Sequence, residues 1–307
     1  MPPRKSVADK LKKPLQIILF VLFFAGGTLY YFIIGETKAP GFGSDVADYE
    51  VAGIEFHFLD VGQGDCSLIL CDEYAVLIDG GEYENGEYIV PYLKDHGVEK
   101  VDLMVASHRH SDHIGGLTAV LEQMPVSEIL INPDGVSEDV DSLAEEQFLS
   151  VAQEQEVTMT IAEVGTVYDF AGLHLSVLSA DAQCAQENES SVVLLAACDR
   201  TTALFTGDIS EETEKSLCTS GKIADCDILK VAHHGSNYSN SDDFIRMVSP
   251  EYAVVSCAAD NAYGHPGAKT LDRLQNVGAT LYRTDQMGTI AITCFAEKTS
   301  IYINGKD

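Results

Sequence analysis

Basic residues are scarce in this chain of 307 residues, and they are unevenly placed. The chain has 19 Lys and Arg against 48 Asp and Glu, which gives a net charge of −29. Residues 1–13 hold five basic residues and one acidic residue, so the remainder has 14 basic and 47 acidic residues, a net charge of −33. Such a body repels a polyanion such as DNA at long range, which argues against non-specific DNA binding. Any contact with a nucleic acid would therefore depend on metal ions and a local basic strip.

The cysteines lack the C-x-x-C spacing that is typical of a zinc site built from thiolates. There are eight: Cys66, Cys71, Cys184, Cys198, Cys218, Cys226, Cys257 and Cys294. Disulfides are permitted if the domain lies outside the cell, but the spacing selects no pattern. Cys198 and Cys257 lie in strand-like runs, where Cys behaves as a small buried apolar residue. The apolar fraction of 46% predicts a folded core rather than disorder.

Residues 14–34 form an uncharged apolar run, PLQIILFVLFFAGGTLYYFII. About 20 such residues cross a bilayer as one helix. Because the basic residues 1–13 precede the run, the positive-inside rule predicts a cytoplasmic tail, a single-pass anchor in the cell membrane and an extracellular body. Residues 35–50 then form a linker and residues 51–307 the main domain. A cleaved signal peptide is the alternative, but its apolar region spans roughly 7 to 15 residues, and no clear A-x-A site follows here.

The segment SHRHSDHIGG, residues 107–116, concentrates side chains that bind divalent metals. Imidazole nitrogen and carboxylate oxygen are ligands of borderline ions. The segment offers His108, His110, Asp112 and His113. In extended backbone, residues two apart point to the same side, so the first two histidines can bind one metal while the aspartate and the third histidine face a second. A polar loop with chance histidines is the alternative, which three histidines and an aspartate in this order disfavour.

The flanking residues place this segment between a strand and a helix. Residues 101–107 are apolar and predict a buried strand, and the residues from Ile114 onward predict a helix that Pro125 closes. Asp79 and Asp208 also follow predicted strands, so their carboxylates lie at strand ends. Asp79 could hold a metal-ligating imidazole from outside the ligand set, although a plain turn aspartate is an equal alternative.

Further histidines occur near strand ends later in the chain. His233 and His234 follow a predicted strand, whose geometry would send them to opposite faces, so only one points at the site unless the strand has already ended. His265 lies at the head of a predicted helix. His174 alternates with apolar residues and is predicted to face solvent.

Strand runs separated by amphipathic helices predict an α+β fold in which two sheets face each other and helices lie outside. The first strands, in residues 54–81, are separated by turns and predict an antiparallel start. The polar strand ends would gather at one edge of the sandwich. Of the nine histidines, three fall outside this edge: His57, His96 and His174.

Taken together, the motifs resemble the metallo-β-lactamase superfamily. HxHxDH, LIDGG, FTGD and GHP carry this resemblance, and FLDVGQGD, NESSVVLL, LKVAHHGS and YGHP look most like the hydrolase domain of ComEC-type DNA-internalisation competence proteins. The resemblance covers roughly residues 54–307. It implies a four-layer αβ/βα sandwich with a dinuclear metal site at one edge.

The resemblance also implies roles for individual residues. Its metal ligands correspond to His108, His110, Asp112, His113, Asp208 and His265. The first two would hold the first metal, Asp112 with the other two histidines would hold the second, and Asp208 would bridge them. Asp79 would support a ligand from the second shell.

Catalytic and substrate-binding roles follow from the same resemblance. Asp112 would belong to the catalytic set, and His233 or His234 would protonate the leaving oxygen or stabilise the transition state. Ser236 and Lys230 would assist at substrate oxygens.

The chain departs from the family pattern in two places. Many members supply a further histidine to the first metal from the region before the TGD strand, where this chain has residues 188–191. That metal would be completed by water or by His233 or His234. Competence proteins of this type have many membrane helices, whereas one is predicted here, so DNA transport by this chain alone is not expected.

These features predict an anchored, extracellular hydrolase with two Zn²⁺ or Mn²⁺ ions, which lower the pKa of a bound water to about 7. A phosphodiesterase or nuclease acting on DNA is the leading hypothesis. A phosphorylcholine esterase acting on cell-wall polymers and a lactone or β-lactam hydrolase are alternatives with the same metals. A non-catalytic DNA- or cell-wall-binding module with a degraded metal site is the non-enzyme alternative, which the intact HxHxDH motif, Asp208 and His265 oppose.

Overall fold

A computed structural model describes residues 53–132, 142–180, 187–198, 200–295 and 298–304. All described residues belong to one compact unit within residues 51–307. The predicted tail, anchor and linker lie outside the described residues, and they stay predictions. Within the described part of the chain, no helix is both long enough and apolar enough to cross a membrane.

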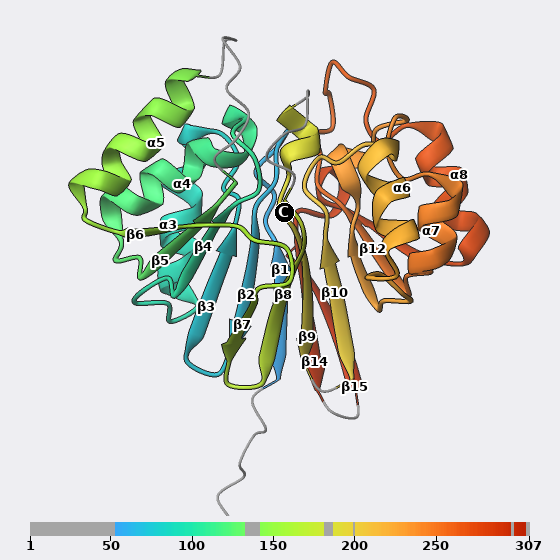
Figure 1. The fold of residues 1–307 in the computed structure, drawn as a ribbon, viewed down its shortest axis with the longest axis horizontal. Coiled ribbons are helices and arrows are strands. Elements are labelled where there is room, and N and C mark those ends of the chain that lie inside the picture. Colours follow the sequence, from blue (N-terminus) through green and yellow to red (C-terminus); the bar gives the residue numbers. More distant parts are fainter. Residues whose placement is uncertain (1–52, 133–141, 181–186, 199, 296–297, 305–307) are drawn as a thin grey trace, which may run out of the picture. The chain divides into compact units, whose positions relative to one another are not determined.

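Two β-sheets face each other, and helices lie on their outer sides (Figure 1). The first sheet has the order β15-β14-β1-β2-β3-β4-β5-β6. Its strands are β1 (Ile54–Phe58), β2 (Ser67–Cys71), β3 (Tyr74–Ile78), β4 (Leu103–Ala106), β5 (Glu128–Ile131), β6 (Thr158–Ile161), β14 (Thr289–Phe295) and β15 (Lys298–Asn304). The second sheet has the order β13-β12-β11-β10-β9-β8-β7. Its strands are β7 (Val167–Phe170), β8 (Leu173–Ser179), β9 (Val193–Cys198), β10 (Thr201–Phe205), β11 (Ile228–Lys230), β12 (Tyr252–Val255) and β13 (Thr280–Arg283).

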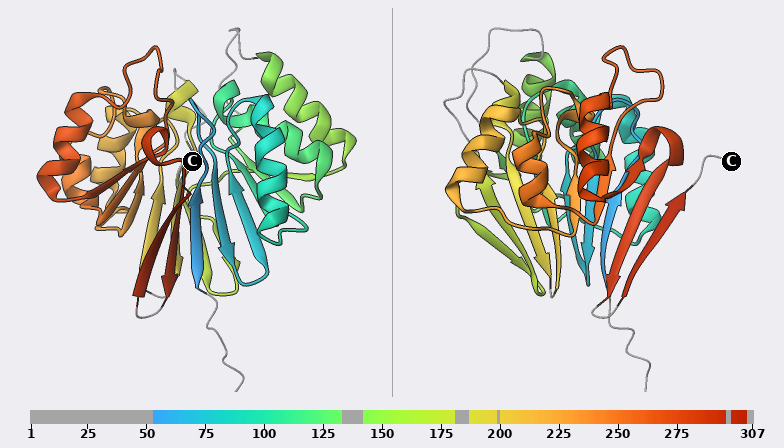
Figure 2. Two further views of the ribbon diagram at one scale, coloured as in Figure 1. Left: turned by 180° about the vertical axis from the view of Figure 1, so that it is seen from behind. Right: turned by 90° about the vertical axis from the view of Figure 1, so that its right-hand side faces the viewer.

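Each sheet is covered by its own group of helices, which Figure 2 shows from two further sides. The first sheet packs against α3 (Gly86–Asp95), α4 (Ser111–Gln123) and α5 (Ser142–Glu154). The second sheet packs against α6 (Glu211–Ser220), α7 (Asp242–Val248) and α8 (Ala268–Val277). Short helical turns are η1 (Tyr83–Asn85), η2 (Glu187–Ser190), η3 (Ala232–Gly235) and α9 (Thr284–Met287). The expectation of two facing sheets with helices outside is confirmed.

The core is divided into three apolar clusters by the two sheets. Side chains of one face of each sheet meet in the middle, where Phe56 and Phe58 lie against Phe205. The opposite faces pack under the helices, with Leu77 and Met104 in one cluster and Leu229 and Ala253 in the other. Strands that are buried on both faces need apolar residues throughout, which is why runs such as VDLMVA do not alternate.

Strand direction explains where the polar residues gather. The pairs from β3 to β6 and from β10 to β13 are parallel. In a parallel sheet all carboxyl ends lie at one edge, and ligands bind there. The loops after β3, β4, β10, β11 and β12 therefore bring Asp79, His108, Asp208, His233 and His265 to the same edge.

Candidate metal centre

The HxHxDH segment is positioned by close packing of α4 on the loop that follows β3. The helix begins at Ser111, three residues before the predicted Ile114, so Asp112 and His113 lie in its first turn. A Cβ atom at Gly116 would lie 2.0 Å from the carbonyl oxygen of Gly80. The two glycines after the motif thus let the helix backbone touch the LIDGG loop, which brings His113 next to Asp79.

Asp79 holds His113 in one orientation. Its Oδ2 lies 2.8 Å from His113 Nδ1 and accepts a hydrogen bond from Ser107 Oγ at 2.7 Å, and its Oδ1 accepts one from the Ser107 amide at 2.8 Å. An imidazole that donates through Nδ1 to a carboxylate presents Nε2 as a metal ligand. The contact is the one expected of a residue that orients a ligand without binding the metal.

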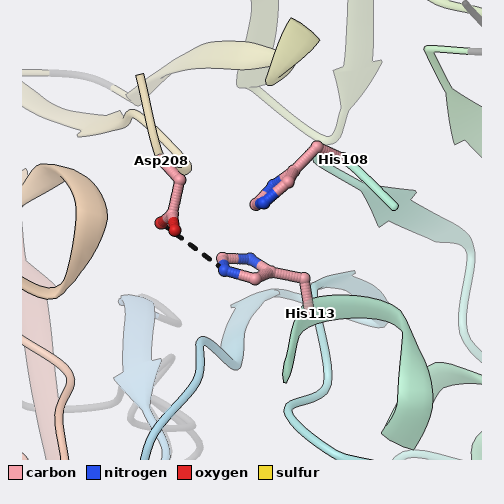
Figure 3. A group of neighbouring side chains, drawn as sticks. All are labelled: His108, His113 and Asp208. Carbon is pink, nitrogen blue, oxygen red and sulfur yellow. Dashed lines mark ion pairs between the residues drawn. The ribbon is translucent and has the colours of Figure 1, made fainter. Parts of the chain in front are cut away.

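Four elements bring their ligand atoms together at the edge of the sandwich. His108, His113 and Asp208 offer atoms that all lie within 4.8 Å of one another, and Figure 3 shows the three side chains converging from separate segments. Three further groups meet the same criterion among the described residues, namely Asp112, His113 and His234, then Asp65, Asp79 and His113, and then Asp65, Asp208 and His234. All four combine imidazole with carboxylate, the donor set that suits zinc and manganese.

The spacing within these groups fits ligands of a divalent ion. His113 Nε2 lies 3.4 Å from Asp208 Oδ1, while His234 Nε2 lies 3.4 Å from Asp112 Oδ2 and 3.5 Å from Asp208 Oδ2. Two ligands on one tetrahedral zinc ion, with bonds of about 2.0 to 2.1 Å, lie about 3.4 Å apart. The two oxygens of Asp208 therefore face two different imidazoles, as a bridging carboxylate does.

Several of these atoms are buried without a hydrogen-bond partner among the described residues. They are His113 Nε2, Asp208 Oδ1, His234 Nε2 and His265 Nδ1. Buried polar atoms in native proteins almost always have a hydrogen-bond partner, so a cluster of buried atoms without one requires an explanation. A bound divalent ion would explain the cluster, and the residue types present fit such an ion.

The charges of these side chains also favour a bound cation. Burial alone would lower the pKa of His234, but the carboxylates of Asp208 and Asp65 outweigh it and raise the pKa to about 10. Burial would raise the pKa of Asp208, but His234 and His113 hold it well below its usual value. Protons on the imidazoles thus neutralise the carboxylates, and bound metal ions would replace those protons.

Both histidines of the HHGS motif face the site, because β11 has already ended at Lys230. His233 and His234 each have φ of 51°, in the left-handed region. His233 Nε2 lies 3.6 Å from Asp208 Oδ2, so the unusual backbone turns both rings toward the same carboxylate. Left-handed backbone in residues other than glycine costs about 1 to 3 kcal/mol each and occurs preferentially at functional sites.

Two predicted ligands, His110 and His265, lie beside the metal-capable groups found among the described residues. His110 Nδ1 lies 2.9 Å from His108 Nε2, so the two rings are neighbours as predicted. His265 is half-buried, and its ring lies 6.2 Å from that of His234. Among the described residues, His234 belongs to a group whose ligand atoms lie within 4.8 Å of one another, whereas His265 does not. His174 is exposed, as predicted.

Asp65, which the sequence did not single out, contacts His234 at Nδ1, the ring nitrogen that does not face Asp208. Asp65 Oδ1 lies 3.3 Å from His234 Nδ1, and Asp65 Oδ2 accepts a hydrogen bond from Lys230 Nζ at 2.6 Å. Lys230 is 2% exposed, and neither it nor the equally buried Ser236 lines the cavity. The signal in the sequence was an acidic residue between the glycines of VGQGD and an apolar strand.

A cavity of about 690 Å³ adjoins the candidate ligand groups. The residues that line it include Asp112, Asp208, His233, His234 and His265. Asn188 also lines it, with its amide nitrogen 3.4 Å from His233 Nε2. Among the described residues that line the cavity, there is no lysine or arginine.

Known proteins are similar to this chain in sequence or in fold. A family model described as "Metallo-beta-lactamase superfamily" matches residues 59–259. ComE operon protein 3 of Bacillus subtilis is 32% identical over 77% of this chain and 32% of its own length. Competence protein ComA of Neisseria gonorrhoeae is 31% identical over 75% and 31%, and Recombination protein 2 of Haemophilus influenzae is 29% identical over 79% and 29%. The chain thus spans about a third of these relatives.

Two solved structures share the fold at low sequence identity. The metallo-beta-lactamase fold protein YhfI from Bacillus subtilis has a TM-score of 0.52 and 12% identity, covering 75% of this chain and 96% of its own. A variant of the CmlA beta-hydroxylase has a TM-score of 0.53 and 11% identity, covering 78% and 54%. The family resemblance that the motifs predicted is confirmed. With the fold, the ligand groups and the family model in agreement, this chain belongs to the metallo-β-lactamase superfamily.

Proposed function

We propose that this protein is a dinuclear, metal-dependent phosphodiesterase that cleaves DNA. One observation carries the proposal, namely the convergence of buried, unpartnered atoms of His113, Asp208 and His234 at the spacing of metal ligands. Members of the superfamily are generally metal-dependent hydrolases. The names of the relatives, which refer to competence and recombination, support DNA as the substrate.

The ligands would divide around Asp208. One of its oxygens faces His113 and the other faces His234, so this carboxylate would bridge two ions. His108 and His110 would complete one side, and Asp112 with His265 the other. When bound, the ions would supply Lewis acidity and a water of lowered pKa.

His233 is placed to act on the substrate. It is the less buried of the two HHGS histidines, with 26% of its side chain exposed, and it lines the cavity. Burial lowers its pKa, although Asp208 opposes this, so the ring is neutral at pH 7 and carries one N–H. That N–H would donate to the leaving oxygen or to a phosphoryl oxygen, which stabilises the charge that develops there.

Lys230 would contribute indirectly to catalysis. Because Lys230 pairs with Asp65 and Asp65 contacts His234, the lysine would help to fix the imidazole rather than reach the substrate. The anchor of residues 14–34 would hold the domain at the outer surface of the membrane, where DNA outside the cell is accessible.

Metal content and substrate turnover test the proposal together. The full-length chain, metal-free and then loaded with Zn²⁺ or Mn²⁺, would be assayed on DNA, a phosphorylcholine ester, a lactone and a β-lactam. We expect about two ions per chain and cleavage of DNA. Cleavage of another member of the panel alone would reassign the substrate, and a chain that binds no metal and turns over nothing would refute the enzyme.

Matched variants locate the activity. Asp208→Ala removes the carboxylate that faces both imidazoles and is expected to abolish tight metal binding and turnover. Asp169→Ala removes an exposed carboxylate that pairs with His174, and neither quantity is expected to change. Full activity of Asp208→Ala would show that the site is elsewhere.

A further inference from the structure

An exposed tyrosine stands at the mouth of the metal-site cavity. Tyr263 lines the cavity and is 72% exposed, although large aromatic side chains are usually buried to a greater extent. Its ring is nearly parallel to that of His265, at 22° and a centroid distance of 5.6 Å. His265 is in turn stacked on His234, at 29° and 6.2 Å. A stack of rings therefore runs from the mouth to the metal groups, and its outer end is open.

The loop that carries Tyr263 is held by the side chain of Asn261. Its Oδ1 accepts hydrogen bonds from the amides of Tyr263 at 3.2 Å and His265 at 2.9 Å. Its Nδ2 donates to the carbonyl oxygens of Ala258 at 2.8 Å and His265 at 2.7 Å. The tyrosine is thus presented by an ordered turn, which lowers the entropy that a ligand must remove when it stacks on the ring.

The charges around the cavity disfavour the usual binding of a nucleic acid, in which basic side chains contact its phosphates. Glu82 and Glu84 line the cavity together with Asp112 and Asp208, and no lysine or arginine does so among the described lining residues. Phosphates other than the one at the metals would therefore meet repulsion instead of basic side chains. Stacking on an aromatic ring is the other general source of affinity for nucleic acids, and it requires a base with a free face.

We infer that the base beside the scissile phosphate stacks on the ring of Tyr263, an inference that rests on the proposed phosphodiesterase function. The site then takes an unpaired nucleotide, in a single strand or at a frayed end, because a base inside a duplex is already stacked on both faces. Tyr263 determines substrate specificity and takes no part in the bond cleavage itself.

Two small substrates distinguish a loss of base stacking from a loss of bond cleavage. Thymidine 5′-(p-nitrophenyl phosphate) and methyl p-nitrophenyl phosphate share a leaving group, but only the first has a base. We expect Tyr263→Ala to raise KM for the thymidine ester roughly 5- to 150-fold, with kcat little changed, and to leave the methyl ester unaffected. Tyr263→Phe keeps the ring and is expected to retain the wild-type KM. Equal losses on both esters, or no loss on either, would overturn the inference.

A binding measurement keeps the inference independent of turnover. Fluorescence anisotropy with labelled single-stranded oligothymidylate and a blunt duplex, in the presence of a chelator, is expected to show tighter binding of the single strand. Tyr263→Ala should remove this preference, whereas Tyr238→Ala, at an 81% exposed tyrosine that does not line the cavity, should preserve it. Equal binding of both nucleic acids by the wild type would refute base stacking on Tyr263. Tyr263-dependent binding without hydrolysis would refute only the phosphodiesterase.

Discussion

The buried pair formed by Asp65 and Lys230 offers a sharp test of how the site is supported. Lys230 is 2% exposed, and its ammonium group contacts Asp65 Oδ2 at 2.6 Å and the Val231 carbonyl oxygen at 3.2 Å. Asp65→Asn removes the negative charge but keeps the shape of the side chain. The lysine then stays buried with no carboxylate partner, a change that typically costs about 3 to 5 kcal/mol of stability.

The measurable size of this effect follows from the size of the domain. For a domain of 150 to 250 residues, 1 kcal/mol corresponds to about 2 to 4 °C in Tm, so Asp65→Asn should lower Tm by roughly 6 to 20 °C. Thermal and urea unfolding of the metal-free chain would measure it. Asp169→Asn, which breaks the exposed pair with His174, should change the free energy of unfolding by less than about 1 kcal/mol.

The double variant Asp65→Asn with Lys230→Met decides whether the unpaired charge is the cause. Because no charge is then left without a partner, most of the lost stability should return. A single variant as stable as wild type would refute the reasoning, and so would a double variant as unstable as Asp65→Asn alone.

Metal uptake by the metal-free protein at pH 7 should release protons, because the pKa of His234 is raised to about 10 and the ring is protonated until a metal displaces the proton. Apparent affinity should then rise with pH from 6 to 9, and calorimetry in two buffers that gave no proton release would contradict this. Asp79→Asn should weaken metal binding about 10- to 100-fold, because Asp79 orients His113. Competition with a chromogenic chelator measures the affinity, and an unchanged affinity would rule out this orienting role of Asp79. Gly116→Ala should lower the free energy of unfolding by about 1 to 3 kcal/mol, because its Cβ would meet the Gly80 carbonyl oxygen; urea unfolding with wild-type stability would show that the helix can move away.

Local pattern was sufficient to predict the two facing sheets, the outer helices and most of the residues that the structure brings together at the candidate site. Periodicity decides which residues form strands and helices, and parallel strands must end at one edge, so the order of polar strand ends in the sequence already indicated where a site would form. The HxHxDH segment is the strongest case, because Asp112 and His113 are neighbours along the chain and only their helical turn had to form. The start of that helix was placed three residues too late, since sequence signals for helix ends are imprecise.

What only the tertiary structure decided is how residues far apart in the chain meet. Asp65, Lys230 and His234 come from a loop of the first sheet and a strand end of the second, so their contact depends on how the two sheets face each other. The sequence shows that His234 follows a strand, but not that a left-handed turn rotates it onto Asp208, where it lies closer than His265. Residue types and strand order are local properties and can be deduced from the sequence, whereas the distances between the candidate ligand atoms are set by packing across the whole sandwich.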